Sequence, residues 1–297
     1  MKLPLLVLGS MPLRLVSFNI RYATTQPVAD EKPWKVRCPK LCNQLRFITA
    51  GRESPFICLQ EVLYSQLEDV QAQLGRPWAH IGRGREQGEK DGEFSPIFYR
   101  ADAWECVRNE TRWLSPTPRV PSRGWDAALN RIVTIGLFRH RATGTRVVVM
   151  STHFDHMGVK ARANSARLLI EFAKEWSVGG PSAVLIGGDF NSPPDDEAYK
   201  VMTASGSGMS DVASLVPESR RYGNEMTYTT FGEPNEVPMR IDFLFIREPR
   251  TAVVNTFGVL ENRFDDKILL SDHRAVVADF EVRAQQNATG EEDPRRD

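Results

Sequence analysis

The chain is poor in cysteine, which argues against a disulfide-stapled or zinc-stabilised domain. Four cysteines stand among 297 residues, and no second Cys or His pair lies near Cys38 and Cys42 to complete a zinc site. Cys58 lies inside an apolar run, as a core residue does. We therefore interpret the cysteines as reduced thiols, and nothing in the sequence requires an oxidising compartment.

The sequence also has no apolar run long enough to span a membrane. Residues 1–10 are largely apolar but short for a signal peptide, so we expect them to be an N-terminal extension. Residues 284–297 are polar and charged, and they predict a disordered tail. We expect a cytoplasmic protein, with the nucleus and secretion as alternatives.

Net charge is absent as well. Lys and Arg together number 38, Asp and Glu also number 38, and the formal net charge is +0. A strongly basic surface for nonspecific binding of duplex DNA is therefore not expected, although a local basic rim is compatible with this balance. The sequence shows no internal repeat and no linker, so residues 11–283 are predicted to form one domain, which we expect to be a monomer.

What the chain does have is an alternation of strand-like and helix-like segments. Runs rich in β-branched and aromatic residues predict strands at residues 13–20, 56–60, 94–99, 132–139, 146–152, 183–187, 241–246, 252–259 and 275–282. Apolar residues at helical spacing predict helices at residues 36–50, 65–74 and 159–176. Residues 111–125 are predicted to be irregular, and the glycine-rich loop 83–93 to be solvated, with substrate binding as the alternative. This pattern predicts an α/β fold of two packed mixed sheets flanked by helices.

The segment IGGDFN (residues 186–191) ends one of these strand-like runs and carries the strongest functional signal. Asp189 and Asn191 are two residues apart, so in an extended chain their side chains point the same way. Gly187 and Gly188 allow a ligand or a neighbouring backbone to come close. An ordinary strand end followed by a turn is the alternative interpretation of this segment alone.

Further polar residues follow or open other strand-like runs, namely Asn19, Glu61, His153, Asp242, Asp272 and His273. Carboxylates and amides are the ligands of a hard cation such as Mg²⁺, and imidazoles beside them supply acid–base chemistry. A set without cysteine argues against structural zinc. Each residue also has an ordinary interpretation, because Asn19 suits a turn, Glu61 suits the start of a helix and His153 suits a surface.

The pair formed by Asp242 and His273 suggests a division of chemical roles. A carboxylate that is hydrogen-bonded to one imidazole nitrogen fixes the tautomer and stabilises the imidazolium. Such a histidine can hold a phosphate or transfer a proton to it. Asp189 is then a candidate for holding an attacking water in line, with Asn191 orienting its neighbourhood. A Mg²⁺ ion on Glu61 would offset charge on the phosphate.

The motifs resemble those of the endonuclease/exonuclease/phosphatase superfamily, in the family's order along the chain. They read SFNIRY with Asn19, LQEV with Glu61, STHFDHMG with His153, GGDFN with Asp189 and Asn191, RIDFLF with Asp242, and LSDH with Asp272 and His273. The resemblance implies a four-layer α/β/β/α sandwich and hydrolysis of phosphoester bonds that depends on Mg²⁺ or Mn²⁺. It implies Glu61 as the principal metal ligand with Asn19 and Asp272 near the ion, and catalytic roles for His153, Asp189, Asn191, Asp242 and His273.

A closer likeness is to stand-alone bacterial and fungal members of the superfamily. It rests on WKVR (residues 34–37), GEFSPIFY (92–99), WLSPTP (113–118) and GWDAALNRI (124–132). From these segments and from STHFDHMG, the residues predicted to position the substrate are Glu93, Tyr99, Arg131, Asp155 and His156.

Departures from the family pattern narrow the function. Apurinic endonucleases usually carry an acid two residues after the first asparagine, where this chain has Arg21, which argues against an abasic-site enzyme. Our first hypothesis is a phosphodiesterase or nuclease that acts on single-stranded nucleic acid or on a small phosphodiester. The alternatives are a phosphomonoesterase acting on a sugar, lipid or inositol phosphate and, with less support, a binding module that has lost catalysis.

Overall fold

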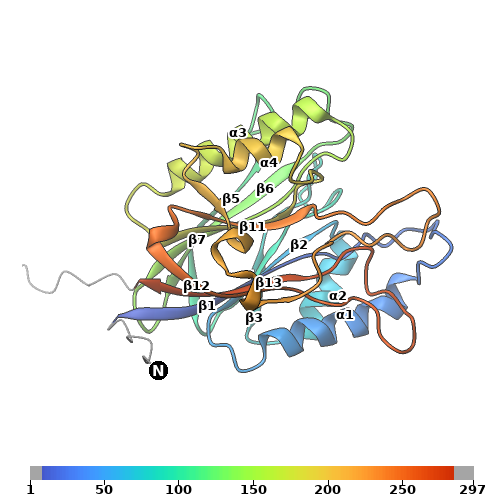
Figure 1. Ribbon diagram of the computed structural model, residues 1–297, viewed down its shortest axis with the longest axis horizontal. Helices are drawn as coiled ribbons and strands as arrows, with labels where there is room; N and C mark the ends of the chain where they lie inside the picture. Colours follow the sequence, from blue (N-terminus) through green and yellow to red (C-terminus); the bar gives the residue numbers. More distant parts are fainter. Residues whose placement is uncertain (1–8, 284–297) are drawn as a thin grey trace, which may run out of the picture.

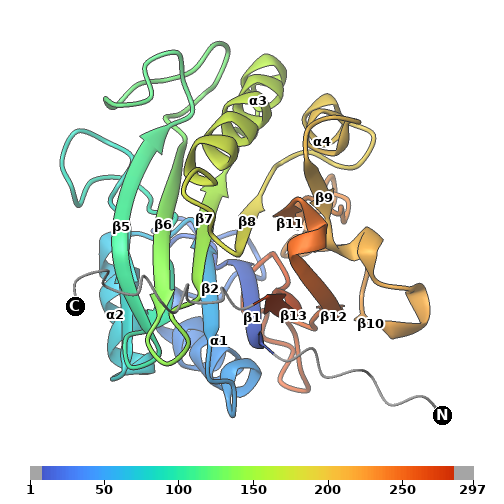
Figure 2. The same cartoon turned by 90° about the vertical axis from the view of Figure 1, so that its left-hand side faces the viewer.

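In the computed structural model, which describes residues 9–283, two mixed β-sheets pack face to face (Figure 1, Figure 2). The first sheet has the strand order β10-β12-β13-β1-β2-β4-β3, and the second has the order β5-β6-β7-β8-β11-β9. The strands of the first sheet are β1 (Ser10–Asn19), β2 (Pro55–Gln60), β3 (Trp78–Ile81), β4 (Ile97–Arg100), β10 (Arg221–Gly223), β12 (Ala252–Val259) and β13 (Val276–Arg283). Those of the second are β5 (Trp104–Trp113), β6 (Ile132–His140), β7 (Arg146–His153), β8 (Ala183–Asp189), β9 (Met209–Asp211) and β11 (Asp242–Arg247).

Helices cover the outer face of each sheet. Figure 1 shows α3 and α4 above the second sheet and α1 and α2 below the first. These helices are α1 (Trp34–Thr49), α2 (Tyr64–Leu74), α3 (Val159–Trp176) and α4 (Glu197–Thr203), and short 3-10 helices span Val212–Leu215, Glu218–Arg220 and Pro249–Thr251. Within residues 9–283, no helix has both the length and the apolar character that a membrane crossing requires.

The buried apolar residues form three layers, one outside each sheet and one between the two sheets. The layer between the sheets includes Leu15 of β1 and Val149 of β7. Leu41 of α1 lies in the layer outside the first sheet, and Leu169 of α3 lies in the layer outside the second. Helices that bury an apolar stripe on each side of two stacked sheets give four layers, so the predicted α/β/β/α sandwich is confirmed.

Strand direction brings the functional segments to one end of the sandwich. β1 runs parallel to β2, and β7 runs parallel to β8. Because the carboxyl ends of parallel strands lie at the same edge of a sheet, Asn19, Gln60, His153 and Asp189 end their strands at shared edges. β11 runs antiparallel to β8, so its first residue, Asp242, lies at that edge too.

The main differences from the predicted elements concern polar strands. Residues 111–125 were predicted to be irregular, but β5 extends to Trp113 and irregular chain begins only after it. The centre of β5, Arg108–Glu110, is charged or polar and largely exposed because β5 forms the edge of the second sheet. The strand expected at residues 94–99 is shorter and shifted, to Ile97–Arg100, and the half-buried β3 was not predicted. The expected first strand starts at Ser10, and the segments 1–8 and 284–297 lie outside the described residues.

Candidate active site

The second sheet places three of the predicted residues side by side. Asp189 is the register partner of His153 on β7 and of Asp242 on β11. All three side chains are buried. An imidazole and two carboxylates are therefore held at neighbouring positions by backbone pairing alone.

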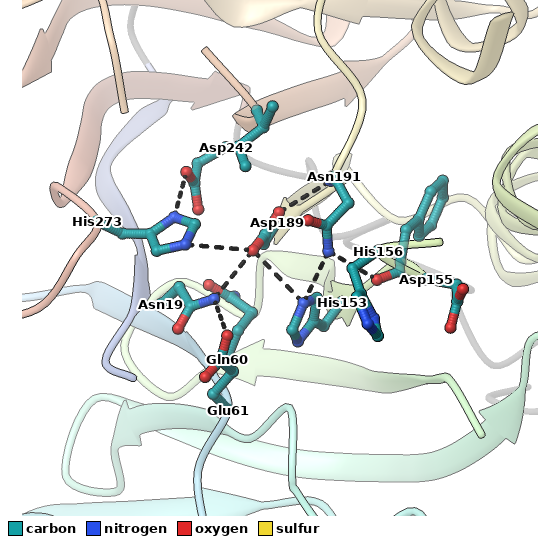
Figure 3. A network of polar contacts seen from close by, with 12 residues as sticks. Asn19, Gln60, Glu61, His153, Asp155, His156, Asp189, Asn191, Asp242 and His273 are labelled. Atoms are coloured by element: carbon teal, nitrogen blue, oxygen red, sulfur yellow. Dashed lines mark hydrogen bonds and ion pairs between the residues drawn. The ribbon is translucent and has the colours of Figure 1, made fainter. Parts of the chain in front are cut away.

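The first sheet contributes an amide and a carboxylate to the same place. Asn19 pairs in register with Gln60, and Glu61 follows with a positive φ of 59°, a backbone conformation that is uncommon for a residue with a side chain. Asn19 Nδ2 donates to Glu61 Oε1 and to Asp189 Oδ2, both at 2.9 Å (Figure 3). The amide of Asn19 thus bridges carboxylates from the two sheets. The alternative of Glu61 as a helix-start residue does not hold, because α2 begins later, at Tyr64.

A glycine permits this close approach of the sheets. A Cβ atom on Gly187 would lie 3.1 Å from Ser17 Cβ and 3.2 Å from Cys58 Cβ, which belong to strands of the facing sheet. Gly187 and Asp189 lie two apart on β8 and point to the same face. The missing side chain at residue 187 therefore lets the sheets come close where Asp189 meets Asn19.

The segment before β13 brings the last two predicted residues. Ser271 Oγ donates to the carbonyl of Asn19 (2.7 Å), and Asn262 Nδ2 donates to the carbonyls of Ser271 and His273 (2.8 Å each). His273 Nδ1 lies 2.8 Å from Asp242 Oδ2, and its Nε2 lies 3.7 Å from Asp189 Oδ2. Asn262 was not predicted, because a lone amide in a loop carries no sequence signal of its contacts.

The residues brought together here form one cluster, which consists of Asn19, Glu61, His153, Asp189, Asp242, Asp272 and His273. The pKa shifts within this cluster indicate the charge states of its members. Burial alone would lower the pKa of His273, but the carboxylates of Asp242 and Asp189 outweigh it and raise this pKa to about 10. Burial and the Asp242 carboxylate raise the pKa of Asp189 to about 7, against the opposing effect of His273. Burial also raises the pKa of Asp272, to about 6. His273 is accordingly an imidazolium at neutral pH, whereas Asp189 changes its protonation state close to neutral pH.

His153 has a defined tautomer. Asn191 Nδ2 donates to the carbonyl of Phe154 (3.0 Å), which fixes the orientation of the amide, and the same nitrogen lies 3.0 Å from His153 Nε2. His153 Nε2 must then accept, so the ring proton sits on Nδ1. Burial, with the nearby cations Arg131 and Arg85, holds the pKa of His153 well below its ordinary value, and the ring is neutral.

Asp155 and His156 hold Arg131 rather than facing the carboxylate cluster directly. Arg131 Nε lies 3.4 Å from Asp155 Oδ2, and Arg131 Nη2 lies 3.0 Å from His156 Nδ1. Asp155 is fully occupied as an acceptor for the backbone N–H groups of residues 128, 129, 157 and 158. Asp155 therefore holds together the two loops that surround Arg131.

Tyr99 is a predicted positioning residue that lies away from the cluster altogether. It pairs with Phe56, near the beginning of β2, whereas the cluster lies beyond the end of that strand. Its ring packs against Phe138, with 4.9 Å between centroids, at the edge of the layer between the sheets. The position of Tyr99 in the motif reflects packing, because the motif continues past the site into β4.

The sequence predicted that the loop 83–93, which precedes β4, is solvated, but part of this loop is buried. Arg85 is only 8% exposed, and its Nη1 donates to Glu93 Oε2 at 2.8 Å. Glu93 Oε2 lies 3.9 Å from His153 Nδ1, which places this loop beside the cluster. Arg85 was missed because charges interspersed with glycines have no periodicity that separates a buried arginine from exposed ones.

The donor set suits a hard divalent cation. Single ligand atoms of Glu61, His153 and Asp189 lie within 4.8 Å of one another, as do those of Asp189, Asp242 and His273. Asp272 is close enough to Glu61 for the two charges to interact. The carboxylates and the amide that meet here belong to Glu61, Asp189, Asp242, Asp272 and Asn19. Burial raises the pKa of Asp189 and of Asp272, which shows that their charged forms are disfavoured. A bound cation would stabilise those charged forms.

Known proteins match this chain over most of its length. The model of the Endonuclease/Exonuclease/phosphatase family matches residues 16–273. A crystal structure of an endonuclease/exonuclease/phosphatase from Bacteroides vulgatus is 33% identical, with a TM-score of 0.82, and the match covers 92% of this chain and 99% of that one. A mannosyl-6-phosphatase from Bacteroides thetaiotaomicron is 31% identical, with a TM-score of 0.80 and coverage of 90% and 99%.

A curated relative with a different activity also matches. The 3'-5'-exoribonuclease subunit Ccr4 of the CCR4-Not complex from Coccidioides immitis is 21% identical over 93% of this chain and 48% of its own length. The chain spans less than two thirds of the length of the curated relatives that it matches.

Proposed function

The chain belongs to the endonuclease/exonuclease/phosphatase family, whose members hydrolyse phosphoesters, and from that premise we propose how its own residues carry out this reaction. The observation that carries the proposal is the position of Asp189, which contacts Asn19 from the facing sheet and lies between His153 and His273. Asp189 holds a water molecule and accepts its proton as the water attacks phosphorus in line. Its raised pKa suits a base that works near neutral pH.

His273 complements that base with a positive charge. Its imidazolium, kept charged by Asp242, donates a hydrogen bond to a phosphoryl oxygen as negative charge develops there. Asn191 keeps its backbone N–H on Asp189 Oδ1 (2.9 Å) and thereby orients the carboxylate. In this proposal Asp189 and Asn191 position the nucleophile and His273 stabilises the transition state.

Glu61, Asp272 and Asn19 would hold a divalent cation, Mg²⁺ or Mn²⁺, on the first-sheet side of the cluster. Such an ion, when bound, polarises the phosphoryl group and offsets charge on the leaving oxygen. Arg21 stands where a second acid would extend this ligand set, and its charge interacts with Asp272 and Glu61. The chain therefore supplies ligands suited to one principal ion.

Two substrate classes have specific support. A phosphodiesterase or nuclease that acts on single-stranded nucleic acid or a small phosphodiester is supported by the likeness to an exoribonuclease subunit. A phosphomonoesterase acting on a sugar phosphate is supported by the likeness to a mannosyl-6-phosphatase, which is the closer in identity of the two.

Hydrolysis of p-nitrophenyl phosphate and bis-p-nitrophenyl phosphate, with Mg²⁺, with Mn²⁺ and with EDTA, tests the reaction and separates the classes. We expect turnover that requires metal and that falls by about two to four orders of magnitude in Glu61→Gln and Asp189→Asn. Asp195→Asn, at an exposed carboxylate near the site in sequence, is the matched control and should leave the rate unchanged. Full activity of folded Asp189→Asn protein would refute the assignment of the base.

A further inference from the structure

A narrow crevice lies beside His153, which forms part of its lining. It offers a volume of about 10 Å³, which is room for roughly one water-sized atom. Its lining consists of Arg85, Glu93, Ser95, Asn130, Arg131, Ile132 and His153. Two guanidinium groups and one carboxylate make this lining positive.

Among residues 9–283, three nitrogen atoms of the residues that line this crevice have no hydrogen-bond partner. They are Arg85 Nε, Arg131 Nη1 and His153 Nδ1. Their residues are only 8%, 5% and 7% exposed, so solvent does not readily satisfy them. A buried polar group without a partner destabilises the folded state, so three such groups on neighbouring side chains indicate a site for a ligand.

All three atoms are donors. The two guanidinium nitrogens can only donate, and His153 Nδ1 carries the ring proton because Nε2 faces the Asn191 amide. The nearest carboxylate oxygens lie beyond hydrogen-bond distance, with Glu93 Oε2 3.9 Å from His153 Nδ1 and Glu86 Oε1 3.7 Å from Arg85 Nε. A water molecule accepts two hydrogen bonds and would leave one donor unmatched, whereas an anionic oxygen accepts three.

The arginines are held in place by contacts at their other nitrogens. Arg85 Nη1 is bound to Glu93, and Arg131 contacts Asp155 through Nε and His156 through Nη2. The free nitrogens are therefore presented in a fixed geometry, which lowers the entropic cost of binding a ligand. Arg85 and Glu93 also line an adjoining groove of about 460 Å³, formed with residues 22–26, Leu63 and Gly92, which has room for the rest of a substrate.

We infer that this crevice receives one unsubstituted, anionic oxygen of the substrate's phosphate, and that Arg85 makes the enzyme prefer phosphomonoesters to phosphodiesters. The inference rests on the proposed function and selects between its two substrate classes. The crevice has room for a terminal oxygen, which both substrate classes carry, so the charge of the substrate and not the size of the crevice is what separates them. A monoester dianion offers three terminal oxygens and a second negative charge to the two guanidinium groups, whereas a diester offers two terminal oxygens and one charge.

The test compares Arg85→Gln with Lys90→Gln, which removes the same charge from an exposed position in the same loop. We expect Arg85→Gln to lower kcat/KM for p-nitrophenyl phosphate by about tenfold or more, and kcat/KM for bis-p-nitrophenyl phosphate by a clearly smaller factor, about threefold or less, because the diester brings only one negative charge to the two guanidinium groups. Lys90→Gln should change neither. An equal loss on both substrates, or no loss on either, would overturn the inference while leaving the proposed function intact. Absence of metal-dependent turnover of either substrate by the wild type would instead refute the proposed function.

Binding of inorganic phosphate in EDTA provides a measurement that does not depend on turnover. The three donors belong to the protein, so calorimetry should detect phosphate binding by the metal-free wild type and roughly tenfold weaker binding by Arg85→Gln. Asn130→Asp places a carboxylate on the crevice with little change in shape, and it should weaken phosphate binding even if Arg85→Gln does not fold. Equal phosphate affinity in the wild type and in a folded variant would show that the crevice does not hold the anion.

Discussion

Asp155, in the STHFDHMG segment, supports the candidate active site indirectly, by holding Arg131 and the loops around it. It is 1% exposed, and its two oxygens accept hydrogen bonds from four backbone N–H groups and contact Arg131. Burial alone would raise its pKa, but the N–H groups of Gly158, Ala128 and Met157, with the Arg131 charge, lower it to about 2. The charged form of Asp155 therefore stabilises the native state.

This pKa predicts a pH-dependent effect of Asp155→Asn on stability. A lowered pKa contributes stability above the pKa of the unfolded chain, about 4, and that contribution is lost as the pH falls through about 2. At neutral pH we expect the variant to lose roughly 2 kcal/mol in the free energy of unfolding, because an amide N–H₂ would face backbone donors. Urea denaturation at neutral pH and between about pH 4 and pH 2 checks this, with Asp195→Asn as control. A difference that stays constant down to the lowest pH would contradict it.

At the level of residues, the chemical types in the cluster were predictable and their partners were not. Asp189, Asp242 and His273 stand at the ends of apolar runs, and such runs become strands whose ends share an edge. Arg85 and Asn262 lie in loops, where no periodicity relates sequence to burial. Tyr99 shows the opposite error, because a residue of a recognised motif can serve packing alone.

At the level of elements, strand β8 contains two adjacent glycines, and each is required for a different packing reason. A Cβ on Gly188 would lie 2.6 Å from the carbonyl oxygen of Thr152 on β7, and so it would clash with backbone. At Gly187 the nearest atoms are the side chains of Ser17 and Cys58, at 3.1 and 3.2 Å. Gly188 therefore sets the spacing between two strands, whereas Gly187 sets the spacing between the two sheets.

The pair of substitutions Gly188→Ala and Gly187→Ala should differ in severity. We expect both to lower the free energy of unfolding, by about 1–3 kcal/mol, with Gly188→Ala the worse because backbone yields less readily than side chains. Gly188→Ala should also reduce turnover, since it displaces β7 where His153 ends the strand. Urea denaturation and hydrolysis assays on both variants measure these effects. Wild-type stability of Gly188→Ala would contradict the account.

Elements with an apolar pattern were predicted well, and polar ones were not. Helix α3 begins and ends where its apolar stripe predicted, at Val159 and Trp176, because burial of that stripe on the second sheet defines the helix. β5 escaped detection because an edge strand with exposed charges looks like a loop in sequence. Sequence patterns report burial, so they reveal secondary structure only where burial accompanies it.

At the level of the whole molecule, the active-site cluster joins the two halves of the sandwich. Buried acidic groups from both sheets meet there, and their mutual repulsion is relieved when a cation binds. A ligand that binds only the native state stabilises it, by about 2.7 kcal/mol when present at a hundredfold excess over its Kd. We therefore expect metal binding to increase the global stability of this protein.

Thermal denaturation should reveal this coupling. We expect saturating Mg²⁺ or Mn²⁺ to raise the Tm of the wild type by several degrees relative to EDTA, and about 2–4 °C per kcal/mol is usual for a domain of this size class. Glu61→Gln should abolish most of that shift. Its Tm in EDTA should be equal to or below that of the wild type, because the native state favours the charged form of Glu61. Burial alone would raise the pKa of Glu61, but Arg21, Asn19 and the Tyr22 N–H outweigh burial and lower this pKa. An undiminished metal-dependent shift in Glu61→Gln would show that the ion binds elsewhere.

The pairing of β1 with β13 has a consequence for biosynthesis. Ser10–Asn19 lies between β2 and β13 in the first sheet, and the carbonyl of Asn19 accepts the hydrogen bond of Ser271. A chain still growing on the ribosome exposes Asn19 early but lacks the strand beside it and the histidine that completes the cluster. One edge of β1 must wait unpaired until nearly the whole domain has been translated, so the nascent polypeptide acquires hydrolytic capacity in a single late step.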